Sequence, residues 1–544
     1  MKFKGILTFY LAGVALTATA QTHVEGAEYY NADQFENAKE LLLRSLNNPG
    51  TDKAVSDYYL GLVSIDENNT AQARKYFQDG IAANPEYAYN YVGLGRLLLK
   101  EGDKKGAEES FKQAEKLAKK DAALHVAIAR AYDSVDPVLY AKQITNKIEK
   151  ARKTNANSPE VYIFEGDQLK EQKKFGEAGA KYEMAANTDN NATQAYVKYA
   201  NLFTMVNPEY AITMLNKLLE VNPQSALGQR ELAIAYYNGK DYANAAKEYG
   251  KYVQNPSHFK QDENRYAFLL FYGGDYQKGY DYATKLLSED PGNFTAQRYQ
   301  FMNAAQIPAM SDKLLPMAEA LLAAHRAKPA DNKFAAIDYT LIADELSKAK
   351  RADEAISVIE EGIKEMPDNA AFNKDLAMKY VDAGNITGAA KAYEGYLAKV
   401  EKPSYNDYVQ QATFSFYAAV ENKENQPVAD KFFADTEKYA GLAAEILPDN
   451  YKPVKFLGDI AKQKATKETV ESAAVPMYTK AIELLEASQD PSRYKSDAKD
   501  MYNYMGNYYL SIKDIPQAKE YFNKYLQYDP NNDAYRKFVE GLGK

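Results

Sequence analysis

Residues 91–114 read YVGLGRLLLKEGDKKGAEESFKQA, and this order of small and large side chains recurs along the chain. The small residue at the place of Ala107 returns at a nearly fixed interval, with first steps of 35, 34, 34, 37, 33, 34 and 34 residues. A repeat of this length predicts stacked helical hairpins, each of which buries its apolar face against its neighbours. The residues that mark the repeat are Ala38, Ala73, Ala107, Ala141, Ala178, Ala211, Ala245, Gly279, Ala355, Ala389 and Ala518.

The repeat unit resembles that of the tetratricopeptide repeat (TPR) family, in which small residues allow two helices to cross closely. In the third copy Gly95 and Ala107 occupy such places, and Tyr91 stands where the family often has tryptophan, which this chain lacks. Prolines end several units, at Pro85, Pro223, Pro291, Pro367 and Pro530. The resemblance implies an all-α fold, a right-handed superhelical α-solenoid of about 12–14 TPR hairpins.

The repeat is regular in most of the chain and disturbed in a few stretches. The fourth copy is longer, and we expect its second helix, around Ala141, to run three residues further before Ser158. The expected division is a signal peptide over 1–20, eight regular copies over 21–293, a divergent repeat over 294–333, further copies over 334–400, stretched and irregular repeats over 401–490, the last repeat over 491–532 and a capping helix over 533–544.

The N-terminal segment has the pattern of a secretory signal peptide. Lys2 and Lys4 precede an apolar run over residues 5–16, and Ala18-Thr19-Ala20 fits a cleavage site. This run is shorter than the ~20 residues that span a bilayer, and no second run follows it, so direct membrane insertion is not expected. We expect export to the periplasm of a Gram-negative bacterium, with any outer-membrane association made through partners.

Composition restricts the classes of function. Cysteine is absent, which removes disulfides, thiolate metal sites, cysteine nucleophiles and a lipid anchor on cysteine. Loss of Lys2 and Lys4 with the signal peptide would move the formal net charge from -8 to -10, which disfavours nucleic acid as a partner. The four histidines, His23, His125, His258 and His325, are far apart, so no metal, cofactor or catalytic residue is predicted.

The resemblance implies that the first helix of each hairpin lines a concave groove that binds a protein partner. Three aromatic residues of copies seven and eight, Tyr237, Phe268 and Phe271, are expected to form a patch beside Arg230 and Asn264; the alternative is that these rings pack against neighbouring helices. Aromatic and arginine side chains dominate many binding sites. The candidate partner-binding residues are Arg96, Arg130, Asn201, Arg230, Tyr237, Asn264, Phe268 and Phe271.

Three functions are consistent with these patterns. The first is a noncatalytic exported scaffold for protein–protein interaction, in an envelope assembly, secretion or outer-membrane complex. The second is a carbohydrate- or cell-wall-binding protein that uses some of its 46 tyrosines. The third is an enzyme with its site in the irregular stretch over 401–490, for which no nucleophile, metal or phosphate motif is present.

Overall fold

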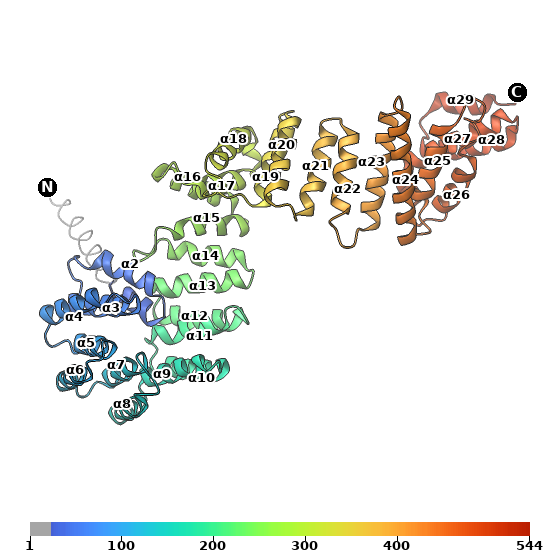
Figure 1. Ribbon diagram of the computed structural model, residues 1–544. Helices are drawn as coiled ribbons and strands as arrows, with labels where there is room; N and C mark the ends of the chain where they lie inside the picture. The colour runs from blue at the N-terminus through green and yellow to red at the C-terminus, as the bar shows by residue number, and fades with distance from the viewer. Residues whose placement is uncertain (1–22, 544) are drawn as a thin grey trace, which may run out of the picture. The chain divides into compact units, whose positions relative to one another are not determined.

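The computed structural model describes residues 23–543, which form two compact units divided in the sequence between Ile307 and Pro308 (Figure 1). The described residues contain helices and no strand, and consecutive helices pack against each other as hairpins. The predicted all-α fold of stacked helical hairpins is therefore confirmed. The expected signal peptide over 1–20 lies outside the described residues.

The first unit consists of eight complete hairpins followed by a single helix. The first helices of its hairpins, and the final helix α17, are residues 23–31, α3 (Lys53–Asp66), α5 (Tyr89–Lys100), α7 (Ala122–Asp133), α9 (Pro159–Glu171), α11 (Thr193–Phe203), α13 (Ala226–Asn238), α15 (Asp262–Tyr272) and α17 (Phe294–Ala304). The second helices are α2 (Phe35–Ser45), α4 (Thr70–Ala83), α6 (Lys104–Leu117), α8 (Ala141–Thr154), α10 (Phe175–Thr188), α12 (Pro208–Val221), α14 (Tyr242–Tyr252) and α16 (Tyr276–Glu289).

The second unit continues the same pattern with longer helices in its middle. Its elements are η1 (Pro308–Met310), α18 (Ser311–Ala327), α19 (Ala336–Lys348), α20 (Ala352–Glu365), α21 (Ala370–Asp382), α22 (Ile386–Leu397), α23 (Tyr405–Glu421), α24 (Gln426–Ile446), α25 (Tyr451–Lys464), α26 (Val475–Glu486), η2 (Pro491–Tyr494), α27 (Lys495–Ser511), α28 (Ile515–Tyr528) and α29 (Asp533–Gly541). Val539 of α29 packs on Ala518 and Phe522 of α28, so this short helix covers the apolar face of the last hairpin.

The small residues of the repeat are where helices approach most closely. Ala73 and Ala107 are completely buried, and so are most of their counterparts in other copies. Gly93 and Gly95 of α5 face the rings of Phe77 and Phe111, which fill the space that a side chain would need. These positions therefore serve packing, as the repeat pattern predicts.

The fourth copy corrects one detail of the predicted register. Ala141 is exposed, and the buried residue at its place in the repeat is Ile144, which stands 37 residues after Ala107 and 34 before Ala178. The extra residues lie in the connection between α7, which ends at Asp133, and α8, which begins at Ala141. The expected extension at the end of the second helix was wrong because a longer turn shifts the start of that helix instead.

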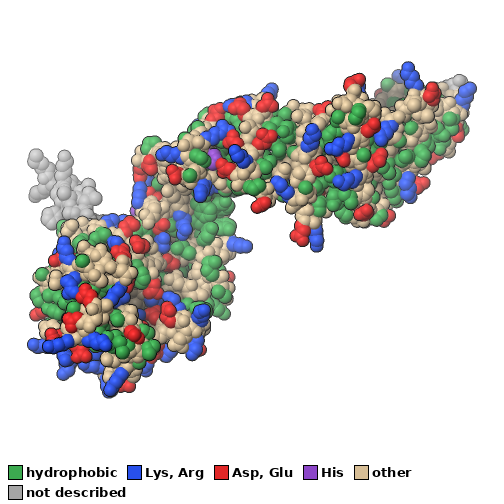
Figure 2. Space-filling model, viewed as in Figure 1, with side chains coloured by type: hydrophobic (Ala, Val, Ile, Leu, Met, Phe, Trp, Pro, Cys, Tyr) green, Lys and Arg blue, Asp and Glu red, His purple; other side chains and the backbone are tan. Residues whose placement is uncertain are grey.

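Exposed lysines gather on the second helices of the third and fourth copies. Figure 2 shows these blue side chains at the lower edge of the first unit, where Figure 1 places α6 and α8. The two helices are joined through Glu115, which pairs with Lys147 at 2.5 Å and Lys150 at 3.1 Å. A hydrogen bond with His125 and these two ammonium groups hold the pKa of Glu115 well below its usual range. The lysine runs are thus solvated helix faces.

The first unit is closed by contacts between its beginning and its later copies. We call residues 23–45 the N-terminal hairpin; it packs against α11, α13 and the connection before α15 (Figure 1). The ring of Tyr29, completely buried, meets Phe259 edge-on at 5.3 Å between centroids. Gln34 donates a hydrogen bond of 2.7 Å to Glu231, and Asp33 pairs with Lys198 at 2.8 Å. The beginning of the first unit therefore meets its sixth and seventh copies and the connection before α15.

Two carboxyl groups of the N-terminal hairpin are buried in this closure. Glu25 accepts hydrogen bonds of 2.8 and 3.3 Å from the backbone N–H groups of Ala226 and Leu227, the first residues of α13. Glu28 accepts one of 2.9 Å from Thr193. The N-terminus of α13 thus obtains acceptors from a segment about two hundred residues earlier.

We expect acid to strengthen this closure. Burial, with a further contribution from the charge of Glu28, raises the pKa of Glu25 from 4.5 to about 8, and burial raises that of Glu28 from 4.5 to about 7. Both groups release their protons near pH 4.5 in the unfolded chain but keep them in the folded one. The free energy of unfolding of the first unit should therefore fall as the pH rises from about 4.5 to about 8.

Chemical denaturation of the full chain across this range measures the effect. In the double variant Glu25→Gln, Glu28→Gln both side chains keep nearly the size of glutamate but cannot titrate. The fall in stability between pH 4.5 and pH 8 should therefore be smaller in this variant than in the wild type. An identical pH dependence for the two proteins would show that these carboxyl groups do not titrate in the closure.

Candidate functional site

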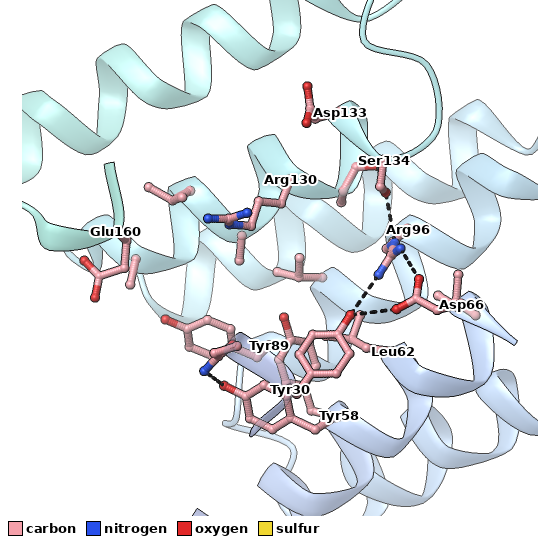
Figure 3. Close-up of a pocket in the computed structure, with 18 of the residues that line it drawn as sticks. Tyr30, Tyr58, Leu62, Asp66, Tyr89, Arg96, Arg130, Asp133, Ser134 and Glu160 are labelled. Atoms are coloured by element: carbon pink, nitrogen blue, oxygen red, sulfur yellow. Dashed lines mark hydrogen bonds and ion pairs between the residues drawn. The ribbon is translucent and has the colours of Figure 1, made fainter. Parts of the chain in front are cut away.

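The first unit contains an open cavity of about 990 Å³, which we call the N-terminal cavity (Figure 3). Side chains from α3, α5 and α7 line most of it, and residues 30–35 of the N-terminal hairpin form one wall. The first helices of successive hairpins therefore face this space. Of the residues predicted to bind a partner, Arg96 and Arg130 line the cavity.

Arg96 is held by three partners in the cavity wall. Its guanidinium pairs with Asp66 at 2.6 Å and donates hydrogen bonds to Ser134 at 2.9 Å and to the hydroxyl of Tyr30 at 3.3 Å (Figure 3). The Tyr30 hydroxyl in turn donates to Asp66 at 3.0 Å. The three partners come from the N-terminal hairpin, from α3 and from the residue that follows α7, so they fix the guanidinium in one position.

Arg130 is paired inside the protein as well. Its guanidinium lies 2.7 Å from Asp167 and over the ring of Phe164, at 5.4 Å from the centroid. Lys198 pairs with the same Asp167 at 3.1 Å. Burial acts to raise the pKa of Asp167, but the positive charges of Arg130 and Lys198 outweigh it and lower that pKa. Arg96 and Arg130 thus have internal carboxylate partners.

A second, smaller cavity of about 290 Å³ lies on α13, α15 and α17, and we call it the aromatic pocket. Three predicted residues line it together: Tyr237, Asn264 and Phe268. The Phe268 ring lies 5.7 Å from that of Tyr237 and 4.6 Å from that of Tyr272, and Tyr237 is 41% exposed. Phe268 therefore packs against neighbouring rings and also forms the pocket wall.

The aromatic pocket has hydrogen-bond donors with no partner in the described part of the chain. Arg265, which lines the pocket, is exposed and makes no ion pair or hydrogen bond there. The side-chain oxygen of Asn264 accepts a bond of 2.9 Å from Asn293, while its amide nitrogen donates to none of the described residues. The pocket therefore offers an apolar space with a cation and an amide donor at its wall.

The other predicted residues are placed elsewhere. Arg230 pairs with Asp262 at 2.8 Å and donates to Gln34 of the N-terminal hairpin at 3.4 Å, so it belongs to the closure. Phe271 packs against Tyr276 at 5.9 Å and Tyr299 at 6.4 Å and does not line the aromatic pocket. Asn201 is exposed and lines neither cavity.

Several residues of both cavities were not among the predicted ones. Tyr58 and Tyr89 line the N-terminal cavity, and Arg265 lines the aromatic pocket. Tyr58 stands in the second copy at the groove place that Arg230 holds in the seventh, so extending the groove rule to that copy would have found it. Tyr30 stands in the first copy at the groove place that Tyr237 holds in the seventh, so the same extension would have found it as well.

Neither a metal centre nor a membrane-spanning helix is found in the described residues. No group of three His, Asp or Glu side chains between residues 23 and 543 is arranged to hold a metal ion. No helix in the same range is long and apolar enough to cross a bilayer.

The stacked hairpins define a helical-repeat protein. Sequence profiles of the tetratricopeptide repeat match residues 64–132, 205–258, 340–406 and 500–532. The chain thus contains tetratricopeptide repeats, a kind of repeat that generally binds protein partners.

Solved structures with similar helical repeats include two bacterial proteins. The C-terminal part of a TPR repeat-containing protein from Cytophaga hutchinsonii is 17% identical, covers 52% of this chain and 100% of its own, and superposes with a TM-score of 0.41. PilF of Pseudomonas aeruginosa is 20% identical over 40% of this chain and 97% of its own, with a TM-score of 0.28. No curated protein matches the sequence.

Proposed function

We propose that this protein is a noncatalytic, exported scaffold of the bacterial envelope that holds a protein partner by an anchor residue in the aromatic pocket. The leader-like sequence of residues 1–20 supports export, and the tetratricopeptide repeats support protein binding. An assembly or secretion complex of the envelope is the setting that agrees with both.

The observation that carries this proposal is the unpaired Arg265 beside an apolar pocket. A volume of about 290 Å³ suits one large apolar side chain, and Tyr237, Phe268 and Tyr299 would surround it. The guanidinium of Arg265 can then bind a carboxylate next to the anchor, and the free amide of Asn264 can donate to a backbone carbonyl. The partner segment would therefore combine an apolar or aromatic residue with a neighbouring acidic group.

Substitutions in the aromatic pocket should weaken the partner without unfolding the scaffold. A photo-crosslinking residue at Ile234, which lines the pocket, captures the partner in cells and allows it to be identified and purified. We expect Tyr237→Ala and Arg265→Ala each to weaken its affinity by about tenfold to a hundredfold, because exposed aromatic and arginine side chains dominate such sites.

Tyr210→Ala is a matched control, since Tyr210 is 54% exposed on α12 of the same unit and lines neither cavity. Circular dichroism checks that each variant keeps its helices. If the purified partner bound Tyr237→Ala and Arg265→Ala as tightly as the wild type, the aromatic pocket would not be its binding site.

A further inference from the structure

Five tyrosine rings form one continuous wall of the N-terminal cavity. Successive ring centroids lie 5.0 to 5.6 Å apart in the order Tyr30, Tyr59, Tyr58, Tyr89 and Tyr87. The hydroxyls of Tyr58 and Tyr87 make no hydrogen bond to any residue of the described chain, although Tyr58 is only 7% exposed. Burial raises the pKa of Tyr58, so its hydroxyl stays protonated and can donate a hydrogen bond to a bound molecule.

The charged side chains of the cavity balance each other. Two carboxylates, Asp133 and Glu160, form no ion pair with any described residue. One oxygen of each accepts a hydrogen bond, from Gln168 and Ser158 respectively, and the other oxygen remains available as an acceptor. Lys100 donates to Asn68 at 2.8 Å and to a backbone carbonyl, and the other cations are in ion pairs. The lining cations are Arg96, Lys100, Arg130 and Lys198, and the lining anions are Asp33, Asp66, Asp133 and Glu160.

We propose that the N-terminal cavity binds a neutral oligosaccharide. The C–H faces of sugar rings lie against the tyrosine wall, and the apolar side chains of Val92 and Val126 also line the cavity. Sugar hydroxyls donate to Asp133 and Glu160 and accept from Tyr58. Sugar hydroxyls both donate and accept hydrogen bonds, so they can pair with this mixture of side chains. A charged peptide would gain no net attraction, because the charges of the lining side chains sum to zero.

The size of the cavity agrees with more than one sugar ring. About 990 Å³ is at the upper end of the range of ~300–1,000 Å³ found for small-molecule sites. The cavity is separate from the aromatic pocket, which is lined by other residues, so a glycan and a protein partner would occupy different sites of the first unit. The scaffold would then connect its protein partner to a polysaccharide.

Titration calorimetry with the full mature chain tests this binding. The probes are tetra-N-acetylchitotetraose, cellotetraose and maltotetraose, all of which are uncharged. At least one should bind, and its affinity should stay within about twofold between low and high salt, because screening acts only on charged ligands. Tyr58→Phe removes one hydroxyl and keeps the ring, and we expect it to weaken binding by about threefold to tenfold. Tyr87→Ala, which removes a ring from the end of the wall, should weaken it further.

The matched controls are Tyr417→Phe and Tyr417→Ala, since Tyr417 is 55% exposed on α23 and lines neither cavity; both should bind as the wild type does. Circular dichroism confirms folding, and Tyr58→Phe remains informative if Tyr87→Ala does not fold. Two outcomes would overturn the proposal: no binding of any probe at millimolar concentration, or unchanged affinity in Tyr58→Phe.

Discussion

Replacing Tyr29 by Ala is expected to release the N-terminal hairpin and to lower the free energy of unfolding of the first unit by about 3–5 kcal/mol. Tyr29 is completely buried and packs edge-on against Phe259, so its removal leaves a cavity at the closure of the unit. Hydrogen exchange should become faster over residues 23–45 and at the start of α13, where Ala226 and Leu227 donate to Glu25. Chemical denaturation measures the change in stability.

Tyr29→Phe is the matched control for this substitution. The hydroxyl of Tyr29 is buried and has no hydrogen-bond partner in the described part of the chain. Because an unsatisfied buried hydroxyl is destabilising, its removal should leave stability unchanged or raise it by about 1 kcal/mol. If Tyr29→Ala lost no more stability than Tyr29→Phe, the ring would not be holding the closure.

Gly93→Ala should also destabilise the first unit strongly. A Cβ at Gly93 would lie 2.1 Å from Phe77, whose ring already meets Gly61 on the neighbouring helix, where a Cβ would lie 2.3 Å away. The ring of Phe77 is completely buried and contacts Gly61 of α3 on one side and Gly93 of α5 on the other. We expect a net loss of about 2 kcal/mol or more, measured by chemical denaturation, because overpacking outweighs the better helix propensity of alanine.

Two further variants separate overpacking from any general effect of a glycine substitution. Gly176→Ala, in α10, meets no atom within 4 Å and should be neutral or stabilising by up to about 1 kcal/mol. The smaller side chain in Phe77→Leu should partly restore stability when combined with Gly93→Ala. Equal stability of Gly93→Ala and the wild type would mean that the ring of Phe77 can shift at little cost.

The repeat pattern was sufficient to predict the hairpins because their contacts are local. Gly93 and Ala107 mark crossings between helices that are adjacent in the sequence, and a fixed interval carries that information. The exception is Ala141, which stands at the regular interval of 34 residues after Ala107 although the longer turn moves the buried place in the repeat to Ile144. Turn length is decided by a few local residues and leaves no periodic signal.

The candidate sites could be predicted only in part. Counting along the repeat identified Tyr237, Asn264 and Phe268, which line one pocket, and Arg96 and Arg130, which line the other cavity. It could not show that the two arginines already have carboxylate partners, because Asp66 and Asp167 belong to neighbouring copies. Nor could it predict the closure, since whether the ends of an array meet depends on small rotations that accumulate over many hairpins.

The contacts of the N-terminal hairpin also affect the order in which the first unit folds. A linear repeat array gains structure hairpin by hairpin, and its end copies fray independently of the rest. Here the N-terminal hairpin, which is synthesised before the rest of the first unit, cannot bury Tyr29 or satisfy Glu25 until Phe259 and Ala226 have also emerged. Because such distant contacts slow folding, the first unit should fold late and as a whole, with its leading hairpin completed last.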